Sequence, residues 1–182
     1  GLTVWGQVRV DGTPGNPQAG RRRPSQEGVY RHIMAVVEAT DLPVMIYDIP
    51  GRTGVRIEDG TLARLAEHPR VLAVKDATGD VEQGFCRMEA TGLEYYSGDD
   101  GLNFAWLAHG ASGVVSVVAH ADAHSWRQMI AAVDAGDLAS ARTLARSLRP
   151  LVHAIMGGGQ GAVMAKEALH LQGDRQSTRP HS

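Results

Sequence analysis

The chain has 182 residues, a formal net charge of -2 and a pI near 6.5, and 43% of its residues are hydrophobic. These values are typical of a globular domain with a sizeable core, and they exclude the charge excess of a nucleic-acid-binding or membrane-surface protein. The single cysteine, Cys86, excludes an internal disulfide and favours a reducing compartment; we expect it to be a buried, small apolar residue. No apolar run approaches the ~20 residues of a membrane span, and the N-terminus lacks a signal-peptide pattern, so we expect a cytoplasmic protein.

Residues 1–28 are rich in glycine, proline and arginine, and they show no regular period after a short strand predicted at residues 2–10. We assign this segment, including Arg21–Arg23, no function. From residue 29 to 122, helices and strands alternate four times, with predicted strands at residues 44–47, 71–75, 93–97 and 113–118. This order predicts an α/β fold with parallel strands and right-handed crossovers.

Residues 123–173 no longer alternate, and their apolar stripes predict a helical C-terminal region followed by a tail at residues 174–182. A helix that contains Leu138, Ala141 and Leu148 is expected to be interrupted by Pro150. A further helix is predicted at residues 163–171.

Lys75 directly follows the unbroken apolar run of residues 71–74 and precedes the turn residues 78–80. Such a run predicts a strand buried on both faces, and the lysine would then lie at its carboxyl end, where parallel α/β folds place their chemistry. An amine in an apolar pocket has a lowered pKa and can attack a carbonyl to form an imine. The simpler interpretation is that Lys75 pairs with Asp76 or extends into water.

Two further strand ends carry residues that suit this chemistry. Tyr47 ends the run of residues 44–46, and its hydroxyl could relay a proton as a carbinolamine becomes an imine. Arg52 follows in the next turn and could present its guanidinium to a carboxylate. The simpler alternatives are a tyrosine that closes the core and a solvated turn arginine.

Three motifs in order and spacing resemble the dihydrodipicolinate synthase family of pyruvate-dependent class I aldolases: residues 47–54 (YDIPGRTG), 73–80 (AVKDATGD) and 95–100 (YYSGDD). The resemblance runs from about residue 24 to about residue 173, with PSQEG at its start. It implies the C-terminal half of a (β/α)8 barrel, which takes about 250 residues in full, plus a helical C-terminal extension.

By position, the resemblance implies that Lys75 forms an imine with pyruvate, that Tyr47 shuttles protons and that Arg52 receives the carboxylate of aspartate semialdehyde. Gly98 and Val115 match positions that line the pyruvate pocket, through backbone more than side chain. The implied reaction yields 4-hydroxy-tetrahydrodipicolinate in lysine and diaminopimelate biosynthesis. It needs no cofactor and no metal, because the intermediate is a covalent imine with the substrate, and family members are homotetramers.

The departures from the family pattern concern both ends of the chain. The family's first half carries a Thr-Thr turn that grips the carboxylate of pyruvate, and this turn is not found in the sequence. The family's paired tyrosines before Pro24 are replaced by Gly20 and Arg21–Arg23. A truncated or frame-shifted gene model would explain both ends, and we expect the chain as given to be an incomplete, inactive fragment.

Two alternatives remain at this point. The chain could be a sugar-acid aldolase such as N-acetylneuraminate lyase, although Arg52 argues against substrates that present hydroxyls there. It could also be a non-catalytic fragment that acts as an assembly partner, because half a barrel leaves two strand edges unpaired.

Overall fold

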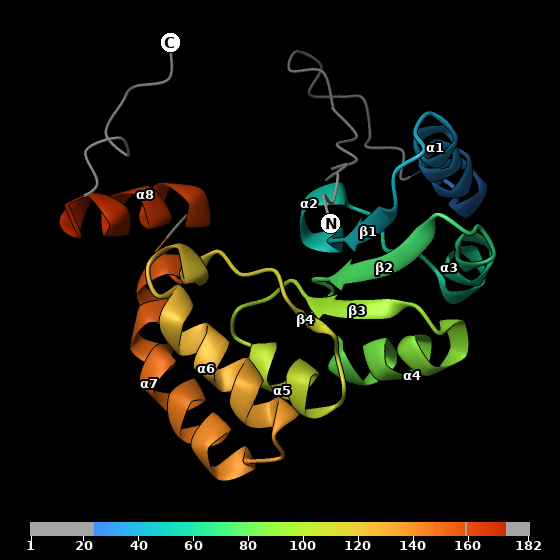
Figure 1. Cartoon of the computed structure of the whole chain (residues 1–182). Coiled ribbons are helices and arrows are strands. Elements are labelled where there is room, and N and C mark those ends of the chain that lie inside the picture. Colours follow the sequence, from blue (N-terminus) through green and yellow to red (C-terminus); the bar gives the residue numbers. More distant parts are fainter. Residues whose placement is uncertain (1–23, 159, 174–182) are drawn as a thin grey trace, which may run out of the picture. The chain divides into compact units, whose positions relative to one another are not determined.

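A computed structural model describes residues 24–158 and 160–173 of the chain. The chain divides into two compact units, with the boundary after Tyr96, and Figure 1 follows their helices and strands in order. None of the described helices combines the length and the apolar character that crossing a bilayer requires.

The first unit alternates helices with parallel strands, which confirms the predicted α/β class. β1 and β2 are parallel, and their register places Tyr47 opposite Lys75 and Asp48 opposite Asp76. The elements of this unit are α1 (Gln26–Glu38), β1 (Val44–Asp48), α2 (Pro50–Thr53), α3 (Asp59–Ala66), β2 (Val71–Asp76), α4 (Val81–Thr91) and β3 (Glu94–Ser97), of which the last residue already belongs to the second unit.

Polar caps fix where the helices around the sheet begin. The Ser25 hydroxyl accepts a hydrogen bond from the N–H of Gly28 at 3.2 Å and so caps α1. The Asp80 carboxylate does the same for α4 by accepting from the N–H of Gln83 at 3.2 Å. Such caps satisfy backbone donors that a helix leaves unpaired, and each stabilises its helix by about 1 kcal/mol.

A buried arginine joins α4 to β1 and α3. The side chain of Arg87 is 5% exposed, and it lies 3.3 Å from Asp48 and 2.6 Å from Asp59. Its Nη2 also donates to the carbonyl of Ile57 at 2.8 Å. Because a buried charge is tolerated only when it is paired and hydrogen-bonded, this network holds the end of β1 firmly against the helices.

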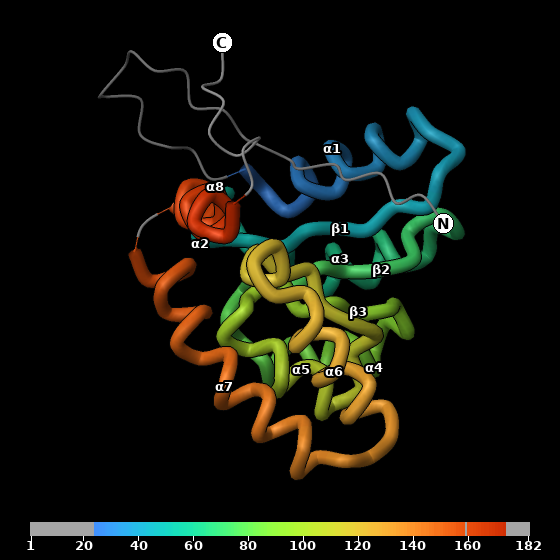
Figure 2. The backbone as a smooth tube through the Cα atoms, turned by 60° about the vertical axis from the view of Figure 1, so that its left-hand side comes forward, coloured from blue at the N-terminus to red at the C-terminus, as the bar shows by residue number. Residues whose placement is uncertain are grey.

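Helices dominate the second unit. Its elements are α5 (Asn103–Ala108), β4 (Gly113–Val114), the 3-10 helix η1 (Val118–His120), α6 (Ala123–Asp134), α7 (Leu138–Met156) and α8 (Gly161–Leu171). α5, α6 and α7 pack side by side (Figures 1 and 2). Their shared core contains Trp126, Met129, Ala141 and Leu148, so the predicted apolar stripes are packing faces.

The strand predicted at residues 113–118 is too long, because β4 ends at Val114. The reason is a side chain from another segment. The buried carboxylate of Asp100 accepts hydrogen bonds from the N–H groups of Val117 and Val118, at 2.9 and 3.3 Å. These donors are therefore not available to a strand ladder, and the backbone turns into η1 instead.

The predicted interruption at Pro150 is also wrong, because α7 continues through it. Proline in a helix interior costs about 3 kcal/mol, since it removes a hydrogen bond and crowds the preceding turn. Leu148 and Ile155, one on each side of Pro150, are both 2% exposed in the core. Burying such side chains contributes about 1.5–3 kcal/mol each, which is enough to keep the helix continuous.

Two expectations about burial fail in the first unit. Leu72 is 51% exposed, so β2 is not buried along its whole length on both faces. Cys86 on α4 is exposed rather than buried.

Candidate active site

Tyr47 and Lys75 lie side by side near the carboxyl ends of β1 and β2. They are register partners in the parallel pair, and both are half-buried. The Nζ of Lys75 lies over the Tyr47 ring, 3.9 Å from its centroid. A cation held over an aromatic face at this distance is an attractive contact, so the lysine amine has a defined position beside the tyrosine.

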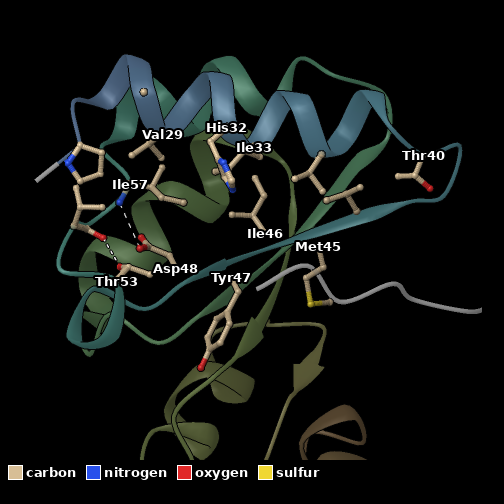
Figure 3. A pocket seen from close by; sticks show the side chains of 15 residues that line it. Val29, His32, Ile33, Thr40, Met45, Ile46, Tyr47, Asp48, Thr53 and Ile57 are labelled. Carbon is tan, nitrogen blue, oxygen red and sulfur yellow. Dashed lines mark hydrogen bonds between the residues drawn. The ribbon is translucent and has the colours of Figure 1, made fainter. Parts of the chain in front are cut away.

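The alternation of β1 determines the face on which this pair lies. Figure 3 shows Ile46 and Asp48 on the side of α1, whereas Met45 and Tyr47 project to the opposite face. Successive side chains of a strand point to opposite faces, and in-register neighbours share a face. Lys75 therefore belongs to the same face as Tyr47, away from the helix that covers β1.

Arg52 is exposed on the short helix α2, which follows β1 directly. The helix begins at Pro50, and the N–H and hydroxyl groups of Thr53 both donate to the carbonyl of Ile49, each at 3.1 Å. Burial raises the pKa of the Tyr47 phenol, and the positive charge of Arg52 lowers it in part. Arg52 is thus close enough to act electrostatically on the tyrosine of the pair.

Gly98 and Val115 lie in the second unit. The N–H of Val115 donates to the carbonyl of Ser97, the residue before Gly98, at 2.8 Å. The structure thus groups the predicted residues in two sets: Lys75, Tyr47 and Arg52 in the first unit, and Gly98 and Val115 in the second.

Sequence reasoning missed the aspartates that follow Tyr47 and Lys75. Asp48 and Asp76 are 3% and 2% exposed and are register partners on the helix side of the sheet. Burial raises the pKa of Asp48 to about 6, although the N–H of Ile57 and the charge of Arg87 lower it. The sequence did carry a signal, because an acid one position after each candidate residue must face the opposite, covered side of the strand.

Asp76 shapes the turn after the lysine strand. Its Oδ1 accepts hydrogen bonds from the N–H and hydroxyl of Thr78 at 2.9 and 2.8 Å. Burial raises the pKa of this carboxyl as well. Asp48 and Asp76 thus anchor the ends of the two strands, while the opposite face carries Tyr47 and Lys75.

A groove of about 280 Å³ separates α1 from β1 (Figure 3). Its walls are largely apolar and include Val29, Ile33 and Val36 of α1 and Ile46 of β1. Among the described residues β1 pairs only with β2, so its other edge carries no partner strand.

The alternation of the backbone identifies which groups of β1 face the edge that is unpaired among the described residues. The N–H of Val44 and the carbonyl of Asp48 bond to the β2 side, at 2.7 and 2.9 Å. Backbone groups alternate along a strand, so the peptide groups of Met45 and Tyr47 face the other edge. The groove and this edge together form an apolar, hydrogen-bonding slot for an extended segment.

In the part of the chain that the structure describes, no three His, Cys, Asp or Glu side chains gather in a geometry that could hold a metal ion. The face opposite α1 carries an amine and a phenol, and α2, directly after β1, carries a guanidinium. These groups suit covalent attack on a carbonyl, proton transfer and carboxylate binding.

Comparison with known proteins assigns the chain to a family. The model of the dihydrodipicolinate synthetase family matches residues 22–181. The 4-hydroxy-tetrahydrodipicolinate synthase of Bifidobacterium longum is 49% identical over 156 residues, which is 86% of this chain and 52% of that protein. The same enzyme of Corynebacterium aurimucosum is 53% identical over 152 residues, which is 83% of this chain and 50% of that protein.

Solved structures agree with the sequence relatives. The chloride-inhibited dihydrodipicolinate synthase of Acinetobacter baumannii, in complex with pyruvate, matches with a TM-score of 0.78 and 37% identity over 83% of this chain and 52% of its own. The synthase of Methylacidiphilum fumariolicum matches with a TM-score of 0.80 and 34% identity, covering 88% of this chain and 53% of its own.

The chain thus spans about half the length of the relatives it matches. The predicted fold class, part of a (β/α)8 barrel with a helical C-terminal extension, is confirmed, because these relatives are barrels and the chain covers about half of them. The motifs around Tyr47 and Lys75, the matched family model and the matched structures lead to one conclusion: the chain belongs to the dihydrodipicolinate synthetase family.

Proposed function

We propose that this chain contributes the imine-forming half of a 4-hydroxy-tetrahydrodipicolinate synthase, a lyase that condenses pyruvate with L-aspartate 4-semialdehyde. The observation that carries the proposal is the placement of the Lys75 amine 3.9 Å from the Tyr47 ring centroid at the register-paired ends of two parallel strands. This placement joins a nucleophile and a proton-transfer group at the end of the sheet where such folds act.

In this proposal the neutral amine of Lys75 attacks the keto carbon of pyruvate. The carbinolamine loses water to give the imine, and the Tyr47 hydroxyl relays the protons that these steps move. Loss of a methyl proton gives an enamine, which adds to the aldehyde of the second substrate. Arg52 binds the carboxylate of that aldehyde, and the backbone at Gly98 and Val115 lines the pyruvate pocket. No cofactor takes part, because the covalent intermediate forms with the substrate itself.

The proposal includes the cellular context and the assembly. The product belongs to lysine and diaminopimelate biosynthesis, and the enzyme works in the cytoplasm as a homo-oligomer. These residues supply only part of the proposed site, since the resemblance places the turn that grips the carboxylate of pyruvate in the family's first half. The chain by itself therefore has no turnover in this proposal.

The imine is tested by reductive trapping on a completed barrel, in which this chain is joined to the N-terminal half of the Bifidobacterium longum synthase. Borohydride added with pyruvate should attach a pyruvate-derived adduct to Lys75, located by peptide mass mapping. The chain has only two lysines, Lys75 and Lys166. Lys75→Ala should abolish the adduct, whereas Lys166→Ala, at an exposed position on α8, is the matched control and should keep it. An adduct located on any other lysine contradicts the assignment.

A second candidate role is assembly without catalysis, and the groove beside β1 favours it. An open strand edge next to an apolar wall adds strands readily. If Lys75 in the completed barrel forms no adduct while the chain still associates through this edge, the assembly role is the better description.

A further inference from the structure

The second unit holds a cavity of about 430 Å³ that the proposed synthase chemistry does not use. It lies among α5, α6 and α7, the three helices that pack together in Figure 2. Its floor is apolar and is formed by Phe104, Trp126, Met129 and Val152. Pockets of about 300–1,000 Å³ with apolar floors and a few polar groups are typical of small-molecule sites.

Three arginines of α7 line one side of this cavity: Arg142, Arg146 and Arg149. Their spacing of four and three residues places them on a single face of the helix. All three are exposed, and none takes part in the ion pairs found among the described residues. Three like charges on one helix face repel each other, so an anion bound between them would be favourable.

Trp126 forms part of the apolar lining of the cavity. This side chain is only 4% exposed. Its Nε1 is buried and has no hydrogen-bond partner among the residues that the structure describes. Because that atom is closed off from the cavity as well as from solvent, Trp126 offers a ligand its apolar ring rather than a hydrogen bond.

One acidic side chain, Asp100, also lines the cavity. Its carboxylate is occupied by donors from Asn103, Ser116, Val117 and Val118. The carboxylate of Asp100 therefore holds the surrounding backbone in place and can accept few further hydrogen bonds from a ligand. Its charge disfavours an anionic group at that end and directs such a group toward the arginines.

We propose that this cavity binds a small organic anion with a ring-shaped apolar body. The carboxylate or phosphate of the ligand is held by the α7 arginines, and its ring packs on the apolar lining of Phe104, Trp126, Met129 and Val152. Charge-assisted bonds from guanidinium groups recognise carboxylate and phosphate alike, so the anionic group can be either one.

Isothermal titration calorimetry on the full chain, without pyruvate, tests the proposal. The probes are phenyl phosphate and benzoate, which carry both a ring and an anionic group. The controls are inorganic phosphate, which has only the anionic group, and phenol, which has only the ring. We expect a ring-bearing anion to bind at least about tenfold more tightly than either control, because it engages both the arginines and the apolar floor. Comparison of the two ring-bearing probes decides between phosphate and carboxylate. Equal binding of phenol, or no binding of any anion, overturns the proposal.

Surface variants distinguish the site from general attraction to a cationic helix. Arg146→Gln and Arg149→Gln should each weaken binding about tenfold. Arg127→Gln, an exposed arginine on α6 outside the cavity lining, is the matched control and should leave binding unchanged. Equal effects of all three variants contradict a defined site.

A second measurement reports on the indole directly. The Trp126 indole N–H resonance, identified by its loss in Trp126→Phe, should shift as phenyl phosphate is added, because the aromatic ring of the probe packs beside the indole. An unchanged resonance at saturation shows that the probe does not bind in this cavity and contradicts the proposal. Neither measurement depends on Lys75, so the failure of one proposal leaves the other untouched.

Discussion

The amine of Lys75 lies over the aromatic ring of Tyr47, 3.9 Å from its centroid, because the two residues are register partners on adjacent parallel strands. The two side chains proposed for imine formation are therefore placed by the sheet itself rather than by a flexible loop. Sites built on regular elements are held more precisely than sites on loops. The aspartates on the opposite face, Asp48 and Asp76, anchor the same strand ends from the covered side.

Tyr47→Phe separates the ring of Tyr47 from its hydroxyl. The variant keeps the aromatic face under Lys75 but removes the proposed proton relay. In the completed barrel we therefore expect pyruvate to bind and the imine to form roughly 100-fold more slowly. Rapid-quench trapping with borohydride measures the rate. Tyr96→Phe is the matched control, because Tyr96 is bonded to Glu94 and should not affect the rate. Equal rates for Tyr47→Phe and the unchanged enzyme exclude the relay.

Arg52→Ala in the completed barrel should mainly impair the use of aspartate semialdehyde. Loss of the guanidinium–carboxylate contact should raise the KM for the aldehyde about tenfold or more, while pyruvate trapping stays largely intact. Arg52→Lys keeps the charge without the planar fork and should give an intermediate KM. Arg31→Ala, an exposed arginine on α1, serves as the control. Equal loss of aldehyde use and of pyruvate trapping indicates a structural role.

The sequence predicted the placement of Lys75 and Tyr47 because unbroken apolar runs define parallel strands, and the ends of such strands meet at one edge of the sheet. It could not predict the early end of β4, because the competing acceptor, Asp100, is 17 residues away from Val117. The continuity of α7 through Pro150 likewise depends on burial of Leu148 and Ile155, which only the packed structure shows. Local sequence patterns thus predict which helices and strands form, whereas contacts between distant residues determine where these elements end.

The buried carboxyl of Asp48 predicts a pH-dependent stability. Its pKa is about 6 in the folded chain against an ordinary value of 3.8, so between these values the folded state binds more protons than the unfolded state. The free energy of unfolding should therefore fall as pH rises from about 4 to about 6, by about 1.4 kcal/mol for each unit of pKa shift. Urea unfolding at several pH values measures this slope.

Asp48→Asn should reduce that slope without removing it, because the pKa of Asp76 is raised in the same direction. Asp59→Asn is the control, since Asp59 also bonds to Arg87 but is exposed. A slope that is unchanged in Asp48→Asn assigns the pH dependence to other groups.

The 182-residue chain alone should give no condensation of pyruvate with aspartate semialdehyde above background. Positioning of reactants supplies roughly 7–11 kcal/mol of barrier reduction in well-oriented sites, and the turn proposed to grip the carboxylate of pyruvate is contributed by the relatives' other half. A coupled assay of the chain alone, and of the chain completed with the Bifidobacterium longum half, measures the difference. Steady turnover by a monomer of this chain would overturn the proposal that this half is incomplete as a catalyst.

Self-association should depend on the groove between α1 and β1. The peptide groups of Met45 and Tyr47 face the open edge, and Val36, 39% exposed, forms part of the apolar wall beside it. A strand from a second copy would satisfy both features, so we expect concentration-dependent oligomers by light scattering.

Val36→Lys places a charge in the groove and should shift the chain toward the monomer. Leu138→Lys changes a residue of similar exposure, 44%, at the start of α7 and outside the groove, and it should leave the oligomers unchanged. If both variants dissociate the oligomers equally, general surface hydrophobicity drives association. If only Val36→Lys dissociates them, the open edge of β1 is the interface.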